Sequence, residues 1–177
     1  MDSRYGRIMS SFADYEDSKK KTDVYPTLLQ AVMEGDGGVF DHLARDEIHT
    51  PLTKAIVLGL HEIVKEMISK GANPNRKDGL GYLPVYLAAD YSTTKVLQVL
   101  LDGGANPNDF GCFNETPIYR AITKKDISYV KILLEAKADP RISVNKDHPS
   151  AHDKLTAYVR DGACDSARFK QMLALME

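Results

Sequence analysis

A period of 33 residues constrains the fold of this chain more than any other feature. Three prolines that each open an apolar segment repeat at this interval: Pro51, Pro84 and Pro117. Three alanines behind a second apolar segment repeat it as well: Ala72, Ala105 and Ala138. One unit of this size cannot bury its own apolar faces, whereas stacked copies can. The period therefore predicts a stack of similar units in which neighbours cover one another.

The unit from residue 50 to residue 75 predicts two helices followed by a hairpin. The first helix, about 51–58, would start at Pro51, where a missing N–H costs nothing, with Thr50 as its N-cap. The second, about 61–70, carries apolar residues at helical spacing. Gly59 and Gly71 would end the two helices, because glycine accepts the left-handed conformation. A turn at residues 77–79 then completes a finger before the next copy begins.

Three copies in the middle of the chain resemble ankyrin repeats. They read TPLTKAIVLGLHEIVKEMISKGANPN, LPVYLAADYSTTKVLQVLLDGGANPN and TPIYRAITKKDISYVKILLEAKADP. The usual pattern of the family is TPLHLAA, a glycine, an apolar helix and GADVN, and the likeness is strong over about residues 26–141. The resemblance implies an all-α fold, an ankyrin repeat solenoid of stacked helix-turn-helix units with β-hairpin fingers.

The chain departs from the family pattern at defined positions. The histidine that usually follows Pro-Leu is replaced by Thr53, Tyr86 and Tyr119. We expect this change to remove a hydrogen-bonding group that helps to tie successive fingers together. Lys125 stands where a helix-breaking glycine is usual. These departures are expected to alter local stability and to leave the fold intact.

Weaker copies at both ends extend the pattern into one predicted domain over residues 22–177. Its repeats would span about 22–45, 46–77, 78–110, 111–143 and 144–177, with the first one shortened. A helix over about 149–160 and a last helix, capped by Asp165 or Ser166 and reaching Met176, would close the C-terminal end. Residues 1–21 contain few apolar groups after Phe12 and are expected to form a loosely ordered tail.

Composition narrows the classes of function. A formal net charge of −2 argues against a general nucleic-acid-binding surface. No apolar run approaches the ~18 residues of a membrane span, and the N-terminus lacks the apolar core of a signal peptide. Two cysteines cannot build a disulfide framework, which favours a reducing compartment. We therefore expect a monomeric protein of the cytoplasm, with the nucleus or a host cytoplasm as alternatives.

The binding surface is expected on the concave face, which such solenoids build from finger tips and the exposed ends of first helices. The fingers would contribute Asp78, Leu80, Tyr82, Phe110, Cys112, Phe113, Glu115, Asn145 and Lys146. The helix ends would contribute Asp90, Tyr91, Thr123 and Lys124. Aromatic residues at these positions favour partner binding, because aromatics are enriched at binding hot spots. The alternative is that they fold back onto a neighbouring finger.

Four cations are predicted to form a basic strip beside the first helices. They are Lys54, Arg120, Lys124 and Lys125. Such a strip would suit an acidic segment of a partner. The alternative is a solvated surface, since unpaired surface charges are common.

The sequence offers little support for catalysis or for metal or cofactor binding, and we assign no catalytic residue, cofactor or metal. His148, His152 and Cys164 could be drawn as metal ligands, but Pro149 separates the histidines and zinc ligands usually occur in closer pairs. Cys112 has no base nearby in the sequence to generate a thiolate. The run DGLGY lacks the spacing of a nucleotide-binding fingerprint.

These observations predict a non-enzymatic protein–protein interaction module. It would bind a partner protein through its concave face as an adaptor or inhibitor. Small inhibitors and microbial effectors of the ankyrin family have a similar length. Two alternatives remain: a metal-binding or enzymatic protein that uses the histidine and cysteine residues of the last repeat, and a structural spacer within a longer chain.

Overall fold

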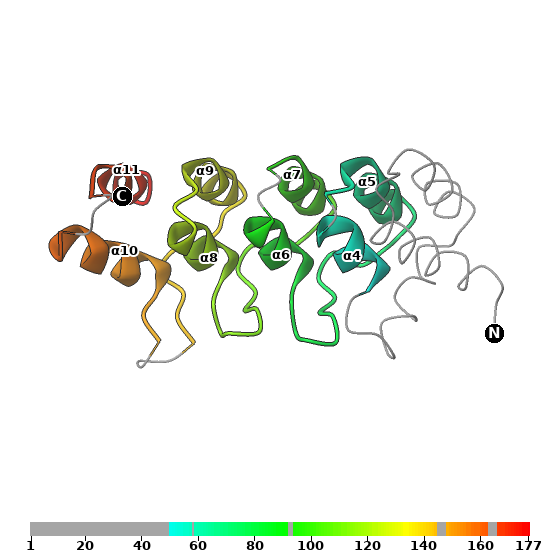
Figure 1. Ribbon diagram of the computed structural model, residues 1–177, viewed down its shortest axis with the longest axis horizontal. Helices are drawn as coiled ribbons and strands as arrows, with labels where there is room; N and C mark the ends of the chain where they lie inside the picture. Colours follow the sequence, from blue (N-terminus) through cyan, green and yellow to red (C-terminus); the bar gives the residue numbers. More distant parts are fainter. Residues whose placement is uncertain (1–49, 58, 92–93, 145–147, 163–165) are drawn as a thin grey trace, which may run out of the picture.

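Helices in two rows make up the structure, a computed structural model that describes residues 50–57, 59–91, 94–144, 148–162 and 166–177 (Figure 1). The first helix of each pair lies in one row: α4 (Pro51–Val57), α6 (Pro84–Asp90), α8 (Pro117–Thr123) and α10 (Ala151–Arg160). The second helices form the other row: α5 (His61–Ser69), α7 (Thr94–Asp102), α9 (Ile127–Glu135) and α11 (Ser166–Ala174). The arrangement confirms the all-α solenoid.

The loops between pairs project from the row of first helices, away from the second row (Figure 1). No β-strand forms within the described residues. Each of two fingers is instead a hairpin-shaped loop with a backbone hydrogen bond across it, from Asp78 N to Tyr82 O at 3.0 Å and from Gly111 N to Glu115 O at 2.9 Å. The fingers thus have the predicted course without a β-ladder.

The helix boundaries follow from their caps. Thr50 Oγ1 accepts a hydrogen bond from Thr53 N at 3.0 Å, which confirms the predicted N-cap of α4. Helix α10 was expected to start at residue 149, but it starts two residues later, at Ala151, because Ser150 is the N-cap. Its hydroxyl oxygen accepts from Asp153 N at 3.1 Å, and Asp153 accepts from Ser150 N in return, which makes a capping box. The last helix ends at Ala174 and does not reach Met176.

Several sequence-based expectations fall outside the described residues. They concern the tail over 1–21, the shortened first repeat over 22–45, the cap at Asp165, and Asn145, Lys146 and Cys164. The division into a tail and five repeats therefore stays a prediction.

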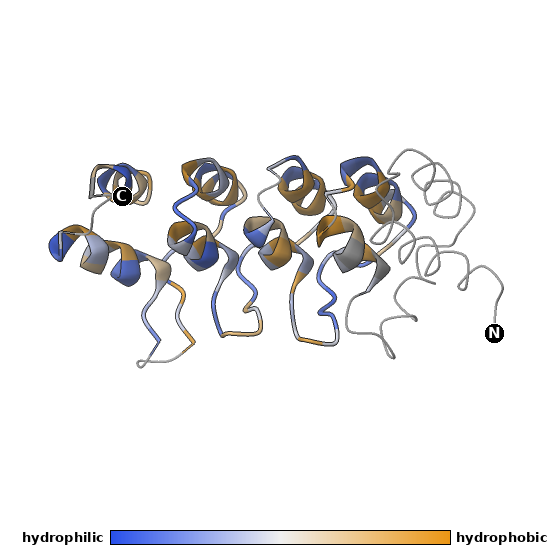
Figure 2. Cartoon of the chain, in the orientation of Figure 1, coloured by the Kyte–Doolittle hydropathy of each residue, from blue (hydrophilic) through white to orange (hydrophobic). Residues whose placement is uncertain are grey.

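The core runs along the stack between the two rows of helices. Small alanines at one position of the first helices are fully buried and let these helices approach: Ala55, Ala88 and Ala121. Each first helix packs against the next first helix, and each second helix against the next second helix. Burying one aliphatic side chain in such a core contributes about 1.5–3 kcal/mol. Hydrophobic residues gather on the helices, while much of the finger loops is hydrophilic (Figure 2).

Asparagine side chains link each copy to the next on the finger side. The amide nitrogen of Asn75 donates to Gly104 O at 2.9 Å, and its Oδ1 accepts from Asn106 N at 2.7 Å. One period later, Asn108 donates to Lys137 O and accepts from Asp139 N. Each side chain satisfies two backbone groups of the following copy, so the asparagines fix the spacing between copies.

Left-handed backbone conformations repeat with the same period. Gly71, Gly104 and Lys137 follow the second helices with φ of 93°, 89° and 67°. Gly59 and Lys125 follow first helices with φ of 69° and 60°. Lysine thus adopts the conformation of the glycine that it replaces, and the helix ends there all the same. A side chain in this conformation costs about 1–2 kcal/mol.

We predict that Lys137→Gly will stabilise the protein by about 0.5–1 kcal/mol, because relief of left-handed strain outweighs the entropy that glycine loses on folding. The free energy of unfolding from urea titration of the full chain measures the effect. Gly104→Ala is the reciprocal control. A Cβ at Gly104 meets no atom within 4 Å, so its expected destabilisation reports backbone strain alone. A lower midpoint for Lys137→Gly would contradict the prediction.

Tyr129 is a buried residue whose hydroxyl is unsatisfied. It is fully buried on α9, and its hydroxyl has no hydrogen-bond partner among the described residues. Burial, with a smaller contribution from the carboxylate of Asp126, raises the pKa of Tyr129 well above its ordinary value. The group therefore stays neutral and unpaired in the core, which is unfavourable for a polar atom.

We predict that Tyr129→Phe will raise the free energy of unfolding by about 1 kcal/mol, because it removes a buried donor without a partner. Tyr86→Phe is the matched control. The Tyr86 hydroxyl donates to Glu115 at 3.0 Å, so the same change there should destabilise by a similar amount. Guanidinium titration of both variants tests the contrast, and equal effects of the two changes would refute it.

Candidate functional site

The finger between α5 and α6 is shaped by Asp78. This residue is 7% exposed, and its Oδ1 accepts hydrogen bonds from Leu80 N at 3.0 Å and from Tyr82 N at 2.9 Å. Gly81 adopts φ of 82° inside the resulting turn. The Asp78 carboxylate therefore stabilises the turn of its own finger. Leu80, at the tip of the turn, is 51% exposed.

The next finger repeats this geometry with different residues. Asn114 has φ of 57° at the position of Gly81, and Phe113, 57% exposed, stands where Leu80 stands in the preceding finger. The two fingers are adjacent, because a Cβ built on Gly81 would lie 3.6 Å from the Cβ of Cys112. Leu80 and Phe113 are therefore equivalent apolar tips on neighbouring fingers.

Aromatic rings connect the finger tip at Phe113 to the first helix α6. The rings of Phe113 and Tyr82 meet edge to face, with centroids 6.2 Å apart, and the centroids of Tyr82 and Tyr86 are 5.9 Å apart. Tyr82 is half-buried and packs against the core, so it folds back onto its neighbours. Phe110 is also half-buried, whereas Phe113 keeps most of its surface in solvent. Of the predicted finger aromatics, Phe113 is the exposed one.

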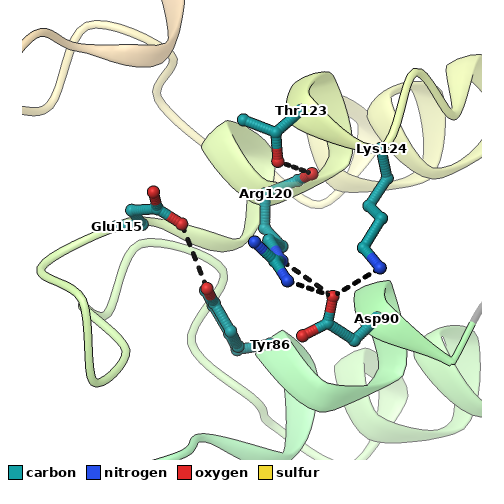
Figure 3. Close-up of polar contacts among 6 residues, drawn as sticks. All are labelled: Tyr86, Asp90, Glu115, Arg120, Thr123 and Lys124. Carbon is teal, nitrogen blue, oxygen red and sulfur yellow. Dashed lines mark hydrogen bonds and ion pairs between the residues drawn. The ribbon is translucent and has the colours of Figure 1, made fainter.

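Tyr86 links its own repeat to the following finger. Its ring is fully buried, and its hydroxyl donates to Glu115 at 3.0 Å (Figure 3). Burial, with a further contribution from the Glu115 carboxylate, raises the pKa of Tyr86 well above its ordinary value, so the hydroxyl remains a donor. The expectation that replacing histidine removes the tie between fingers was therefore wrong at this position. Tyrosine supplies the donor from a longer side chain.

Asp90 gathers two of the cations that the sequence assigned to a basic strip (Figure 3). Its Oδ1 lies 2.7 Å from both Nε and Nη2 of Arg120 and 3.1 Å from Nζ of Lys124. The guanidinium also lies over the ring of Tyr86, with Cζ 5.5 Å from the centroid. The strip is thus partly neutralised by a carboxylate from the preceding repeat, an arrangement that the sequence analysis missed.

The remaining helix-end residues lie around this ion pair. Thr123 turns its hydroxyl inward, since Oγ1 donates to Arg120 O at 2.8 Å. Tyr91, at the C-cap of α6, is 49% exposed, and Lys124 occupies the same place at the end of α8. Tyr91 and Lys124 are therefore the helix-end residues that present side chains to solvent.

The predicted binding residues in the described part of the chain differ in exposure. Those that are exposed are Leu80, Tyr91, Phe113 and Lys124. Those that are buried or half-buried and engaged in the contacts described above are Asp78, Tyr82, Asp90, Glu115 and Thr123. Phe110 and Cys112 are half-buried.

The described residues give no structural basis for a metal site. Within them, no group of three or more His, Cys, Asp or Glu side chains is arranged to hold a metal ion. No helix in the same residues is both long and apolar enough to cross a membrane. His148 and His152 lie in the described part of the last repeat, whereas Cys164 does not.

We predict that Asp90→Ala will destabilise the protein by about 1–2 kcal/mol, because two cations lose a largely buried carboxylate but remain partly hydrated. The exposed Asp102, which accepts a hydrogen bond from Gln98, provides the control: Asp102→Ala should cost less than about 0.5 kcal/mol. Denaturation at 0.1 and 1 M NaCl tests the origin, since salt should reduce the Asp90 effect. Equal losses for the two variants would show that the ion pair contributes little.

Comparison with known families completes the description of the chain. A family model described as ankyrin repeats, in three copies, matches residues 28–110 and again 52–145, and the two matches together cover more than half of the chain. A search of curated proteins gives no match. Ankyrin repeats are in general protein–protein interaction modules and are typically non-enzymatic. The chain belongs to the ankyrin repeat family.

Proposed function

We propose that the chain binds a partner protein through a surface made of Leu80, Phe113, Tyr91 and Lys124, here called the binding face. The observation that carries this proposal is the placement of exposed apolar side chains. The large hydrophobic residues exposed in the described part of the chain are Leu80, Tyr91, Phe113, Val144 and Leu175. Four of these five lie on finger loops or at the end of a first helix.

The contacts beneath the binding face support a role in recognition. Phe113 rests on Tyr82, and Tyr82 rests on the buried ring of Tyr86. Lys124 is held by Asp90 at 3.1 Å. A side chain already ordered in the free protein loses less entropy on binding, which favours affinity. Aromatic residues held in this way are typical of hot spots.

We propose that the chain acts as an adaptor or inhibitor, which recruits or blocks its partner protein through the concave face without chemical change. The exposed finger tips and helix ends of the binding face support this proposal. We propose that the chain acts as a monomer in the cytoplasm, since its two cysteines and its composition favour a reducing compartment.

We predict that the double variant Leu80→Ala/Phe113→Ala will bind the partner at least tenfold more weakly, because it removes both exposed tips. The partner is first isolated from a lysate with the wild-type chain, and its affinity is then measured with purified proteins. Thermal melting should change little, since both side chains are mostly in solvent.

Leu175→Ala is the matched control. Leu175 is 38% exposed but lies beyond α11, away from the fingers, so its loss should leave affinity unchanged. If the double variant binds like the wild type, the binding face lies elsewhere on the chain. If it melts well below the wild type, the two tips belong to the core and the proposal fails.

A further inference from the structure

A pocket of about 310 Å³ lies where the turn between α8 and α9 meets α11. Its lining is mostly charged: Lys124, Lys125, Asp126, Ile127, Ser128 and Arg168. Three of these residues are cations and one is a carboxylate. Lys124 also belongs to the binding face, so the pocket is continuous with the surface proposed above.

The carboxylate of the pocket is already used by the fold. Asp126 is the N-cap of α9, and its Oδ1 accepts a hydrogen bond from Tyr129 N at 3.1 Å. The start of α9 is therefore satisfied from within the chain, and the attraction of the pocket for a ligand comes from its cations. Arg168 reaches it from the first turn of α11 and is exposed.

Cations outnumber carboxylates along this edge, in the lining of the pocket: Lys124, Lys125 and Arg168 against Asp126. Lys124 also pairs with Asp90, and the ammonium nitrogen of Lys125 lies over the ring of Phe169, 5.9 Å from its centroid. This local excess contrasts with the formal net charge of −2 of the whole chain. The edge is thus complementary to negative charge.

We infer that the partner protein places an acidic segment in this pocket, with a carboxylate between Lys124 and Arg168. The inference rests on the proposed function and specifies the chemistry of the partner. A nucleic acid fits less well, because Asp90 and Asp126 lie among the cations and would repel a continuous phosphate backbone.

Nuclear magnetic resonance titration of the full chain tests the inference without the native partner. The probes are two capped octapeptides, GLEELEEG and its uncharged counterpart GLQQLQQG. The acidic peptide should shift the amide signals of residues 124–128 and 166–169, and its affinity should fall with added salt. The glutamine peptide should leave these signals in place. If both peptides act alike, or if neither shifts these signals at millimolar concentration, the inference is overturned.

Two sets of variants distinguish binding in the pocket from non-specific attraction to surface charge. Arg168→Gln should weaken the acidic peptide about threefold to tenfold, whereas the double variant Lys65→Gln/Lys95→Gln, which removes two exposed cations from α5 and α7, should not. Lys124 also pairs with Asp90, so Arg168 provides the cleaner change. Equal weakening by both sets of variants would mean non-specific attraction and would overturn the inference.

An oligonucleotide of ten thymidines provides the competing outcome. If it shifts the same amide signals at a concentration at least tenfold lower than the acidic peptide, the edge is a polyanion site and the acidic-segment inference falls. These titrations leave Leu80 and Phe113 unchanged. A negative result therefore overturns only the inference that the partner has an acidic segment. The Leu80→Ala/Phe113→Ala variant tests the proposed function independently.

Discussion

Burial of each helix pair against its neighbours is the constraint on which the rest of the structure depends. No pair can cover its own apolar faces, so α4, α6, α8 and α10 pack in one row and their partners in another. Because neighbours have to interlock in the same way each time, equivalent residues recur at fixed positions along the stack. For this reason Leu80 and Phe113 lie at equivalent places on adjacent finger tips. The surface of the solenoid therefore presents a row of equivalent positions, one from each copy.

Hydrogen bonds and an ion pair between copies fix the relative positions of these residues. Asn75 and Asn108 each satisfy two backbone groups of the following copy, Tyr86 reaches Glu115, and Arg120 reaches back to Asp90. All of these links join residues about one repeat apart. They fix how far one finger stands from the next, which apolar packing alone leaves adjustable. The exposed residues of the binding face therefore inherit a fixed spacing from contacts that lie beneath them.

The sequence predicted the elements that depend on local rules. Pro51 and Thr50 located the start of α4, and Gly59 and Gly71 were correctly identified as left-handed helix ends. The sequence did not predict that Lys125 and Lys137 adopt the same conformation. It did not predict the contacts that depend on side-chain direction between copies. Asp90 and Lys124 were both assigned to partner binding because spacing places them on one face, but spacing does not show that they pair. Arg168 was missed because α11 belongs to a copy that departs from the period.

At Tyr86, a departure from the family pattern is matched by a residue in the next copy. The large ring of Tyr86 faces Gly111 of the next finger, where an added Cβ would lie 2.9 Å from the ring. One period earlier, the smaller Thr53 takes the place of Tyr86, and Asp78 takes the place of Gly111. In these two copies the large residue is followed by a glycine and the small one by a residue with a side chain. A packed position such as Tyr86 is thus constrained by its neighbour in the next copy, whereas an exposed tip such as Phe113 is not. Specificity for a partner can therefore vary at the tips without disturbing the fold.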